Sequence, residues 1–264
     1  MAQKLIKYSK KPIAAPSANL FAHVSPTSSV HVFNDLYDKD ITIIDGENSK
    51  FGIESTVIKI IQLGEDKEKN ENNLRILILR NGSVSDKALS DHLSNSSNYK
   101  SVDVIRIKKM KSQDINENSE APGQLLKHYS PHCDTFLLES LKKDRINEVS
   151  YEKSELNLKE IVLIDFGGTF SFLKKETLDY CCLSEKADLL EAMNKLYDSL
   201  RWAENISGVK HILITNVDVY FGEKIGKTIP EFLETVFDKT YRSSSGRRLG
   251  YDTITKELLF IKHN

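Results

Sequence analysis

The second half of the chain alternates short apolar runs with amphipathic stretches, and no other feature constrains the fold as strongly. Four of the runs have the length and composition of buried strands: Thr135–Leu138, Ile161–Phe166, Tyr180–Leu183 and His211–Thr215. Ala187–Ala203 carries apolar residues at helical spacing, and Thr228–Tyr241 predicts a second helix with Pro230 in its first turn. Strands separated by helices predict an α/β fold with a mainly parallel sheet and right-handed crossovers.

The first half is predicted to form a separate, strand-rich unit. Ser55–Gln62 and Leu74–Leu79 are rich in β-branched or long apolar residues and predict two strands. The charged insert Gly64–Asn73 lies between them and has the composition of a solvated hairpin connection. Ile41–Ile44 predicts another short strand, which the turn pair Asp45-Gly46 ends.

Two short helices and a linker complete this outline. Ser28–Leu36 predicts a helix with Ser29 as its N-cap, and Ser85–Leu93 predicts one capped by Ser85. Lys111–Glu120 is polar, lacks periodicity and predicts a solvated connection. The chain is therefore divided into residues 1–110, a linker over residues 111–133 and residues 134–264.

The composition excludes several classes of protein. The net charge is −1, which does not favour nucleic-acid binding through bulk electrostatics. Three cysteines, of which Cys181 and Cys182 are adjacent, provide neither a disulfide framework nor a set of metal ligands. No apolar stretch approaches the roughly 18–20 residues that span a bilayer. The expectation is a cytoplasmic protein with no membrane association and no metal site.

Two polar clusters in the first half are candidates for anion binding. Pro12–Thr27 places Ser17, Asn19 and Ser25 among prolines, where small polar groups can turn backbone N–H groups toward an anion. The same residues would also suit a loop that caps the next helix. Asp45–Val57 leads from a turn into Ser55 at a strand entry, which an ordinary turn would explain equally well.

Two further clusters lie nearer the linker. Arg80, at a strand end, can form a forked contact with phosphate or carboxylate, although an exposed arginine is the simpler interpretation. His128 and Tyr129 are adjacent in the linker, where small polar residues are more usual. They would suit either a functional loop or an aromatic anchor.

Taken in order, the four clusters resemble the threonylcarbamoyl-AMP synthases. The matching segments are PIAAPSAN with SPT, DG with FGIESTV, ILRNGSV, and APGQLLKHYSP. The form that they resemble is the longer, Sua-type one, which has an additional C-terminal domain. The second half of this chain resembles that domain more weakly, mainly through the segment LSEKADLLEAMNKLYDSLR. The resemblance implies an α/β architecture, with a partial YrdC-like domain built on a twisted mixed sheet. A smaller Rossmann-like domain with a mainly parallel sheet is expected to follow it.

The resemblance also implies a reaction. Family members combine L-threonine, bicarbonate and ATP to give threonylcarbamoyl-AMP and pyrophosphate, a nucleotidyl transfer in which Mg²⁺ accompanies ATP. The product serves a downstream threonylcarbamoyl transferase complex that modifies adenosine 37 of tRNA. Such a transfer needs positioning, neutralisation of phosphate charge and exclusion of water more than a covalent nucleophile.

The roles of individual residues follow from the resemblance. Catalytic roles fall on Ser17 and Asn19, at the ATP phosphates, and on Ser55, where threonine and the α-phosphate meet. Arg80 is expected on the nucleotide side of the site, and His128 and Tyr129 in a linker folded over the mouth of the cleft as a lid. The residues expected to bind the nucleotide are Ser17, Asn19, Ser25, Ser55, Arg80, His128 and Tyr129.

Some positions depart from the family pattern. Phe21-Ala22 replaces a Ser-Gly pair, Glu47 replaces a glycine and Asn81 replaces a proline. The family's Pro-Thr-Glu-Thr and Arg-x-Pro-x-His segments do not occur, and no Lys-x-Arg pair precedes PIAAPSAN, so about half of the catalytic domain is expected to be lacking. A truncated gene model, a half encoded by a partner and a degenerate paralogue all remain open. Such a half-sheet would have an apolar core open on one side.

Non-catalytic functions remain as alternatives. A YrdC-like protein that binds double-stranded RNA or acts as a regulator is one of them. The basic stretch Arg242–Arg248 suits either an RNA contact or a mobile tail after a helix. Phe166–Thr169 suits either a plain turn or a phosphate-binding loop, although it lacks the full glycine pattern of such loops.

Overall fold

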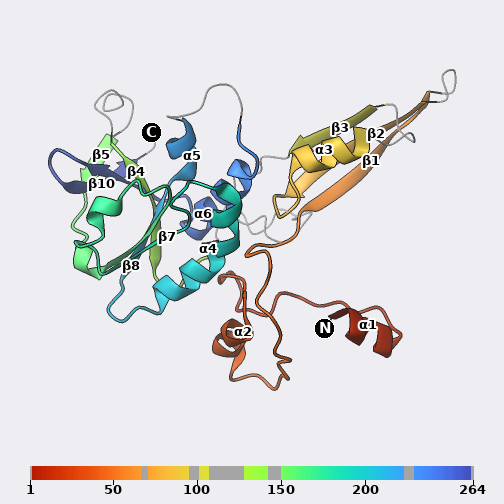
Figure 1. Ribbon diagram of the computed structural model, residues 1–264, viewed down its shortest axis with the longest axis horizontal. Coiled ribbons are helices and arrows are strands. Elements are labelled where there is room, and N and C mark those ends of the chain that lie inside the picture. Colours follow the sequence, from red (N-terminus) through yellow and green to blue (C-terminus); the bar gives the residue numbers. More distant parts are fainter. Residues whose placement is uncertain are drawn as a thin grey trace.

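The computed structural model describes six stretches of the chain, residues 2–66, 71–94, 101–106, 128–141, 150–222 and 229–262. Most of the predicted linker lies outside the described residues, which resume at His128. Two sheets organise the described part of the chain (Figure 1). None of the described helices combines the length and apolar character that crossing a bilayer requires.

The larger sheet lies in the second half of the chain and has seven strands in the order β5-β10-β9-β4-β8-β6-β7. Strands β7, β6, β8, β4 and β9 pair in parallel, and β10 pairs antiparallel with β9 and β5. The predicted mainly parallel sheet is therefore confirmed. The strand bounds are β4 Asp134–Ser140, β5 Ser150–Lys153, β6 Ile161–Asp165, β7 Asp179–Cys182, β8 His211–Thr215, β9 Arg248–Asp252 and β10 Glu257–Lys262.

Alternation along the central strands separates two apolar clusters, one on each face of this sheet. In β6, Val162 and Ile164 join a cluster with helices α4 (Leu189–Glu204) and α6 (Leu233–Ser243), as well as Val217 of α5 (Val217–Gly222). Ile161 and Leu163 belong to the other cluster, with the short helix η3 and strands β9 and β10. The short helices η2 and η3 span Leu158–Glu160 and Ser171–Leu173.

Helix α4 confirms the clearest prediction from the sequence. Asp188 caps its start by accepting a hydrogen bond from the backbone N–H of Glu191. The residues predicted to form its apolar face are all buried: Leu189, Met193, Leu196, Tyr197 and Leu200. Helix α6 begins at Leu233, so the predicted start near Pro230 is wrong. The reason is that Phe232 has a φ of 66° and a ψ of −2°, a left-handed conformation that α-helices exclude.

The segment that joins α6 to β9 was predicted to be either an RNA contact or a mobile tail. Arg242–Arg248 is not a mobile tail, because α6 ends at Ser243 and the turn through Gly246, with a φ of 73°, leads directly into β9. Strand β9 is buried through Leu249–Tyr251 and lies next to β4 inside the sheet. The glycine in the middle of this strand removes the apolar alternation that would have predicted it.

The first half of the chain contributes a three-stranded mixed sheet in the order β1-β2-β3. Strands β1 and β2 form the predicted hairpin, and β3 pairs in parallel with β2. Ser28, not Ser29, caps α2, and Ser85 caps α3 as predicted. Ile41–Ile44 forms no strand, and β3 was not predicted. The bounds are β1 Val57–Asp66, β2 Glu71–Arg80, β3 Ser101–Arg106, α1 Ala2–Ser9, α2 Ser29–Leu36 and α3 Asp86–Ser94.

Large apolar side chains are exposed over much of this first half. Phe21 is 87% exposed and Tyr8 is 81% exposed. Helix α2 turns Val30 and Phe33 to solvent while burying Asp35. Within the described residues, this surface therefore lacks the apolar packing that the C-terminal sheet has on both faces.

Candidate functional site

Ser55 and Arg80 are brought together by the β1–β2 hairpin. The antiparallel register places Val57 opposite Arg80, so the entry to β1 lies beside the end of β2. The Arg80 guanidinium donates from Nε to the Ser55 carbonyl oxygen over 3.1 Å and from Nη2 to Ser55 Oγ over 3.2 Å. An arginine and a serine hydroxyl are thereby fixed at one end of the mixed sheet.

The loop that follows β2 packs tightly against this serine. A Cβ atom on Gly82 would overlap the backbone of Ser55 and Thr56, so only glycine fits there without displacement. The Thr56 hydroxyl donates to the Val84 carbonyl oxygen over 2.7 Å and accepts from the Val84 N–H over 3.0 Å. Both contacts hold the strand entry in place and restrict the movement of Ser55.

Glu54 connects the same strand entry to the C-terminal domain. Its Oε1 accepts a hydrogen bond from Ser25 Oγ over 2.5 Å, and its Oε2 accepts one from the Tyr197 hydroxyl over 2.7 Å. Burial raises the pKa of Glu54, but the Lys239 charge and these hydrogen bonds outweigh it and hold the pKa below its ordinary value. Glu54 is therefore a carboxylate at neutral pH.

Lys239 of α6 supplies the opposite charge from a fully buried position. Its Nζ lies 3.6 Å from carboxylate oxygens of both Glu54 and Asp238. It also lies 4.5 Å from the centroid of the Tyr129 ring and donates to the Tyr129 hydroxyl over 3.3 Å. Burial lowers the pKa of Lys239, and the two carboxylates oppose that shift.

Tyr129 is anchored in the core of the C-terminal domain. It is fully buried, stacks on Tyr197 with ring centroids 5.3 Å apart and has a φ of 59°. Burial raises its pKa well above the ordinary value, so the phenol stays protonated. Its contacts in this structure are with protein side chains such as Tyr197 and Lys239, and the predicted roles of Tyr129 in nucleotide binding and as a lid stay predictions.

His128 lies beside Tyr129 in an edge-to-face contact, with ring centroids 4.0 Å apart. Its Nδ1 is buried and has no hydrogen-bond partner among the described residues. Burial, assisted by the Lys239, Arg242 and Arg80 charges, lowers the pKa of His128 to about 4. The ring is therefore neutral at physiological pH and offers an unused polar atom.

We expect His128 to remain neutral from pH 8 down to pH 5. Its depressed pKa stabilises the folded state above about pH 6.5, and this contribution is lost as the pH falls toward 4, because the unfolded chain binds the proton first. Histidine NMR titration, assigned with His128→Gln, measures this directly. A His128 midpoint near 6.5 would contradict the expectation.

Ser17 and Asn19 lie in a different loop from Ser55 and Arg80, and no hydrogen bond between described residues joins the two pairs. Ser17 is exposed. The Asn19 amide donates to the carbonyl oxygens of Leu20, over 2.8 Å, and His23, over 3.2 Å, while its Oδ1 is buried without a partner among the described residues. The structure therefore groups only part of the predicted site.

Two departures from the family pattern have visible consequences. Ala22, which stands where the family has glycine, has a φ of 63°. An alanine in this left-handed region costs roughly 1–2 kcal/mol. Glu47, which replaces another glycine of the family, is exposed, so its negative charge is solvated and needs no positive partner.

The buried Lys239 lies in a cluster with Glu54, Tyr129 and Tyr197. Of these four residues, only Tyr129 was predicted as a site residue from the sequence. Tyr197 was predicted only as a core residue of a helix. Lys239 follows Val236 by three positions on the same helix, and a lysine on a buried stripe is a signal that could have been recognised. Glu54 lies next to Ser55 but carries no signal of its own.

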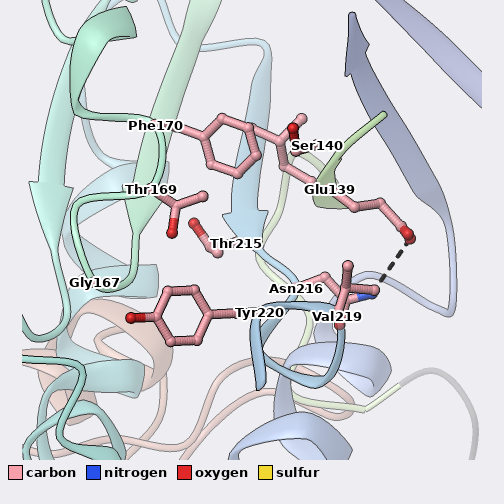
Figure 2. Close-up of a pocket in the computed structure, with 10 residues that line it drawn as sticks. Glu139, Ser140, Gly167, Thr169, Phe170, Thr215, Asn216, Val219 and Tyr220 are labelled. Atoms are coloured by element: carbon pink, nitrogen blue, oxygen red, sulfur yellow. Dashed lines mark hydrogen bonds between the residues drawn. The ribbon is translucent and has the colours of Figure 1, made fainter. Parts of the chain in front are cut away.

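A separate pocket of about 140 Å³ opens at the carboxyl ends of β4 and β8 (Figure 2). Thr169, Thr215 and Tyr220 line it, next to the turn that was weighed as a phosphate-binding loop. Phe166–Thr169 forms a plain turn, because three of its four amides already donate hydrogen bonds within the protein. The Phe166 N–H donates to Asp165 Oδ1 over 2.7 Å, the Gly167 N–H to the Ser184 carbonyl oxygen over 2.9 Å and the Thr169 N–H to the Phe166 carbonyl oxygen over 3.4 Å.

Comparison with known families identifies two matching regions. The family described as "Threonylcarbamoyl-AMP synthase, C-terminal domain" matches residues 99–233, about half of the chain. The family described as "Telomere recombination" matches residues 1–82.

Three curated relatives are named threonylcarbamoyl-AMP synthase. The protein of Pyrococcus abyssi is 33% identical over 53% of this chain and 35% of its own length. The protein of Schizosaccharomyces pombe is 34% identical over 52% of this chain and 30% of its own length. The protein of Bacillus subtilis is 28% identical over 76% of this chain and 51% of its own length. The chain therefore spans between about a third and a half of these relatives.

Two solved structures share the fold. The crystal structure of P. abyssi Sua5 complexed with L-threonine matches 94% of this chain and 62% of its own, with a TM-score of 0.65 and 24% identity. A variant of that protein, with an adjacent histidine and tyrosine changed to alanine, matches with a TM-score of 0.59 at 24% identity and covers 94% of this chain and 61% of its own. The α/β architecture predicted from the sequence is confirmed by this likeness.

Proposed function

Since the chain belongs to the threonylcarbamoyl-AMP synthase family, we propose that it takes part in making threonylcarbamoyl-AMP from L-threonine, bicarbonate and ATP. The observation that carries the proposal is the double hydrogen bond between Arg80 and Ser55. It places a planar cation and a hydroxyl at one end of the mixed sheet, where an α-phosphate and the carbamate of threonine can meet.

The proposed reaction is an adenylyl transfer. A carbamate oxygen attacks the α-phosphorus of ATP, the new P–O bond forms, and pyrophosphate leaves. Arg80 balances the negative charge that builds up on the phosphate oxygens, and the Ser55 hydroxyl orients the carbamate. No covalent intermediate with the protein is required, and neither Ser17 nor Ser55 has a histidine as a hydrogen-bond partner among the described residues.

The remaining predicted residues surround this centre in the proposal. Ser17 and Asn19 contact the ATP phosphates, and the unpartnered Asn19 Oδ1 and His128 Nδ1 receive hydrogen bonds from substrate or water. Ser25 donates to Glu54, so its oxygen is left to accept a hydrogen bond. Tyr129 holds the His128 ring in place through their edge-to-face contact.

ATP enters the proposed reaction as a substrate with Mg²⁺ on its phosphates. Glu54 is adjacent to Ser55 in the chain, but Ser25, Tyr197 and Lys239 already occupy its oxygens. The metal is therefore expected to be held mainly by the triphosphate and water, as magnesium often is. The product would pass to a downstream threonylcarbamoyl transferase complex in the cytoplasm.

We expect Arg80→Gln and Ser55→Ala to abolish most of the activity. The assay supplies ATP, Mg²⁺, L-threonine and bicarbonate, and measures threonine-dependent release of pyrophosphate. Loss of a preorganised donor at a reacting phosphate costs about 10²- to 10³-fold in rate. Arg75→Gln is the matched control, because Arg75 lies on the same strand and pairs with exposed Asp103 over 3.4 Å.

ATP binding gives a second readout for a chain that spans part of its relatives. Isothermal titration with ATP and Mg²⁺ should show at least tenfold weaker binding to Arg80→Gln than to the unaltered chain or Arg75→Gln. Equal ATP affinity in all three proteins, or no binding of ATP or threonine at millimolar concentration, would refute the proposal.

No observation favours the RNA-binding alternative. The arginines of the basic stretch are paired with carboxylates: Arg242 with Asp238, Arg247 with Asp134 and Arg248 with Glu139, at 2.8, 2.7 and 3.7 Å. These contacts neutralise the charge that an RNA backbone would need.

A further inference from the structure

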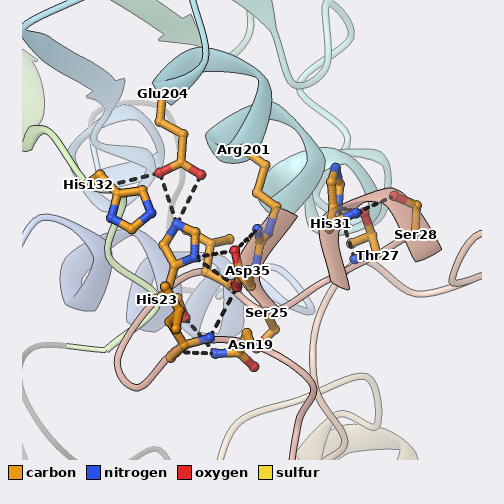
Figure 3. A network of polar contacts seen from close by, with 12 residues as sticks. Asn19, His23, Ser25, Thr27, Ser28, His31, Asp35, His132, Arg201 and Glu204 are labelled. Atoms are coloured by element: carbon orange, nitrogen blue, oxygen red, sulfur yellow. Dashed lines mark hydrogen bonds and ion pairs between the residues drawn. The ribbon is translucent and has the colours of Figure 1, made fainter. Parts of the chain in front are cut away.

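His23, His132 and Glu204 converge from three distant parts of the chain (Figure 3). His23 lies in the loop before α2, His132 lies near the end of the predicted linker, and Glu204 ends α4. One possible ligand atom from each lies within 4.8 Å of those of the other two. His23 Nε2 is 3.0 Å from both oxygens of Glu204. Ligand atoms on a tetrahedral zinc ion lie about 3.3 Å apart, so the spacing requires only small adjustments.

His23 is already oriented in the way that metal-binding histidines usually are. Its Nδ1 lies 3.0 Å from Asp35 Oδ2, which leaves Nε2 to face Glu204. Asp35 is in turn held by Arg201, whose Nη1 and Nη2 donate to its two oxygens over 2.9 and 2.8 Å. A carboxylate on the far nitrogen of a ligand histidine fixes its ring and increases its basicity.

His132 and the neighbouring space complete the arrangement. The His132 backbone N–H donates to Glu204 Oε2 over 2.9 Å, and its exposed ring stacks on His23 with centroids 4.1 Å apart. A rotation of this exposed ring turns a nitrogen toward the other two ligands. A cavity of about 360 Å³, lined also by His31 and Tyr37, adjoins them and has room for a water molecule as fourth ligand.

We propose that His23, His132 and Glu204 bind a divalent transition metal ion, with zinc as the best match. Two imidazoles and one carboxylate are ligands that zinc prefers, whereas magnesium and calcium prefer oxygen alone. Because the ligands come from three segments, the ion joins the first half of the chain to α4 and to the end of the linker.

The proposal predicts zinc binding by the full chain that depends on His132. After treatment with chelator, zinc titration should give one site per chain and a higher melting temperature, as ligand binding to the folded state requires. His132→Gln changes an exposed residue and should fold, yet weaken zinc binding at least tenfold. His92→Gln, on exposed α3, is the matched control and should bind like the unaltered chain.

Cobalt provides a test of the ligands themselves. The unaltered chain loaded with Co²⁺ should show the visible absorption of a four-coordinate ion without a thiolate band. His132→Cys should add a thiolate-to-cobalt band. A thiolate band in the unaltered chain would place the ion on a cysteine such as Cys133, and equal zinc affinity of His132→Gln and the unaltered chain would equally overturn the assignment.

Discussion

Replacing Arg201 with methionine should lower the free energy of unfolding by about 3–5 kcal/mol, the usual cost of removing one partner of a buried ion pair. Arg201 is 3% exposed, donates to both oxygens of Asp35 and also contacts the Val24 carbonyl oxygen. Methionine keeps most of the side-chain volume but removes the positive charge that pairs with the buried Asp35 carboxylate. Urea unfolding at neutral pH measures the loss.

The chain contains its own probe and control for this experiment. Trp202, the single tryptophan, is adjacent to Arg201 and packs against the core, so its fluorescence reports on this junction. Lys195→Met removes an exposed ion pair with Glu191 on the same helix and should cost at most about 0.5 kcal/mol. A decrease of less than about 1 kcal/mol in the free energy of unfolding of Arg201→Met would show that the Asp35–Arg201 pair does not hold α2 against α4.

Tyr129→Ala should be nearly as damaging, at about 3–5 kcal/mol. The change empties a fully buried site between Tyr197 and Lys239 and leaves the lysine without the ring that it faces. Tyr129→Phe keeps the ring and loses only the hydrogen bond from Lys239, so about 1 kcal/mol is expected. Thermal and urea unfolding of both variants provide the measurement.

Tyr37→Ala is the control for Tyr129, because Tyr37 is largely exposed and its removal should be almost neutral. The comparison also tests the predicted lid. If Tyr129→Ala unfolds like the unaltered chain while ATP binding weakens, Tyr129 acts as a movable contact with the nucleotide. A large loss of stability instead identifies it as a fixed anchor.

The C-terminal domain was predictable where periodicity is strong. Helix α4 and strands β4, β6, β7 and β8 carry clear apolar patterns, and the structure confirms each of them within a few residues. Strand β9 was missed because Gly250 interrupts its pattern, and α6 was started too early because nothing in the sequence reveals the left-handed Phe232. Strands β5 and β10 were not predicted either, so strong local patterns identify helix α4 and four of the seven strands of this sheet.

The site was only partly predictable. Ser55 and Arg80 are close because a hairpin joins them, and hairpins leave a local signal. The contact from Tyr197 to Glu54 spans 143 residues, and that from His23 to Glu204 spans 181. Sequence spacing does not predict contacts between residues so far apart. The contacts of Lys239 with Glu54 and of His23 with Asp35 and Glu204 are therefore seen only in the three-dimensional structure.

Because Asp35 and Arg201 are far apart in the sequence, their ion pair can form only late in protein synthesis. The two residues are 166 positions apart, so at 5–20 residues per second Asp35 waits about 8 to 33 s for its partner to be made. Throughout that interval helix α2 lacks the Arg201 guanidinium that pairs with Asp35 in the folded chain. The first half of the chain therefore cannot complete its buried ion pair until most of the second half has been synthesised.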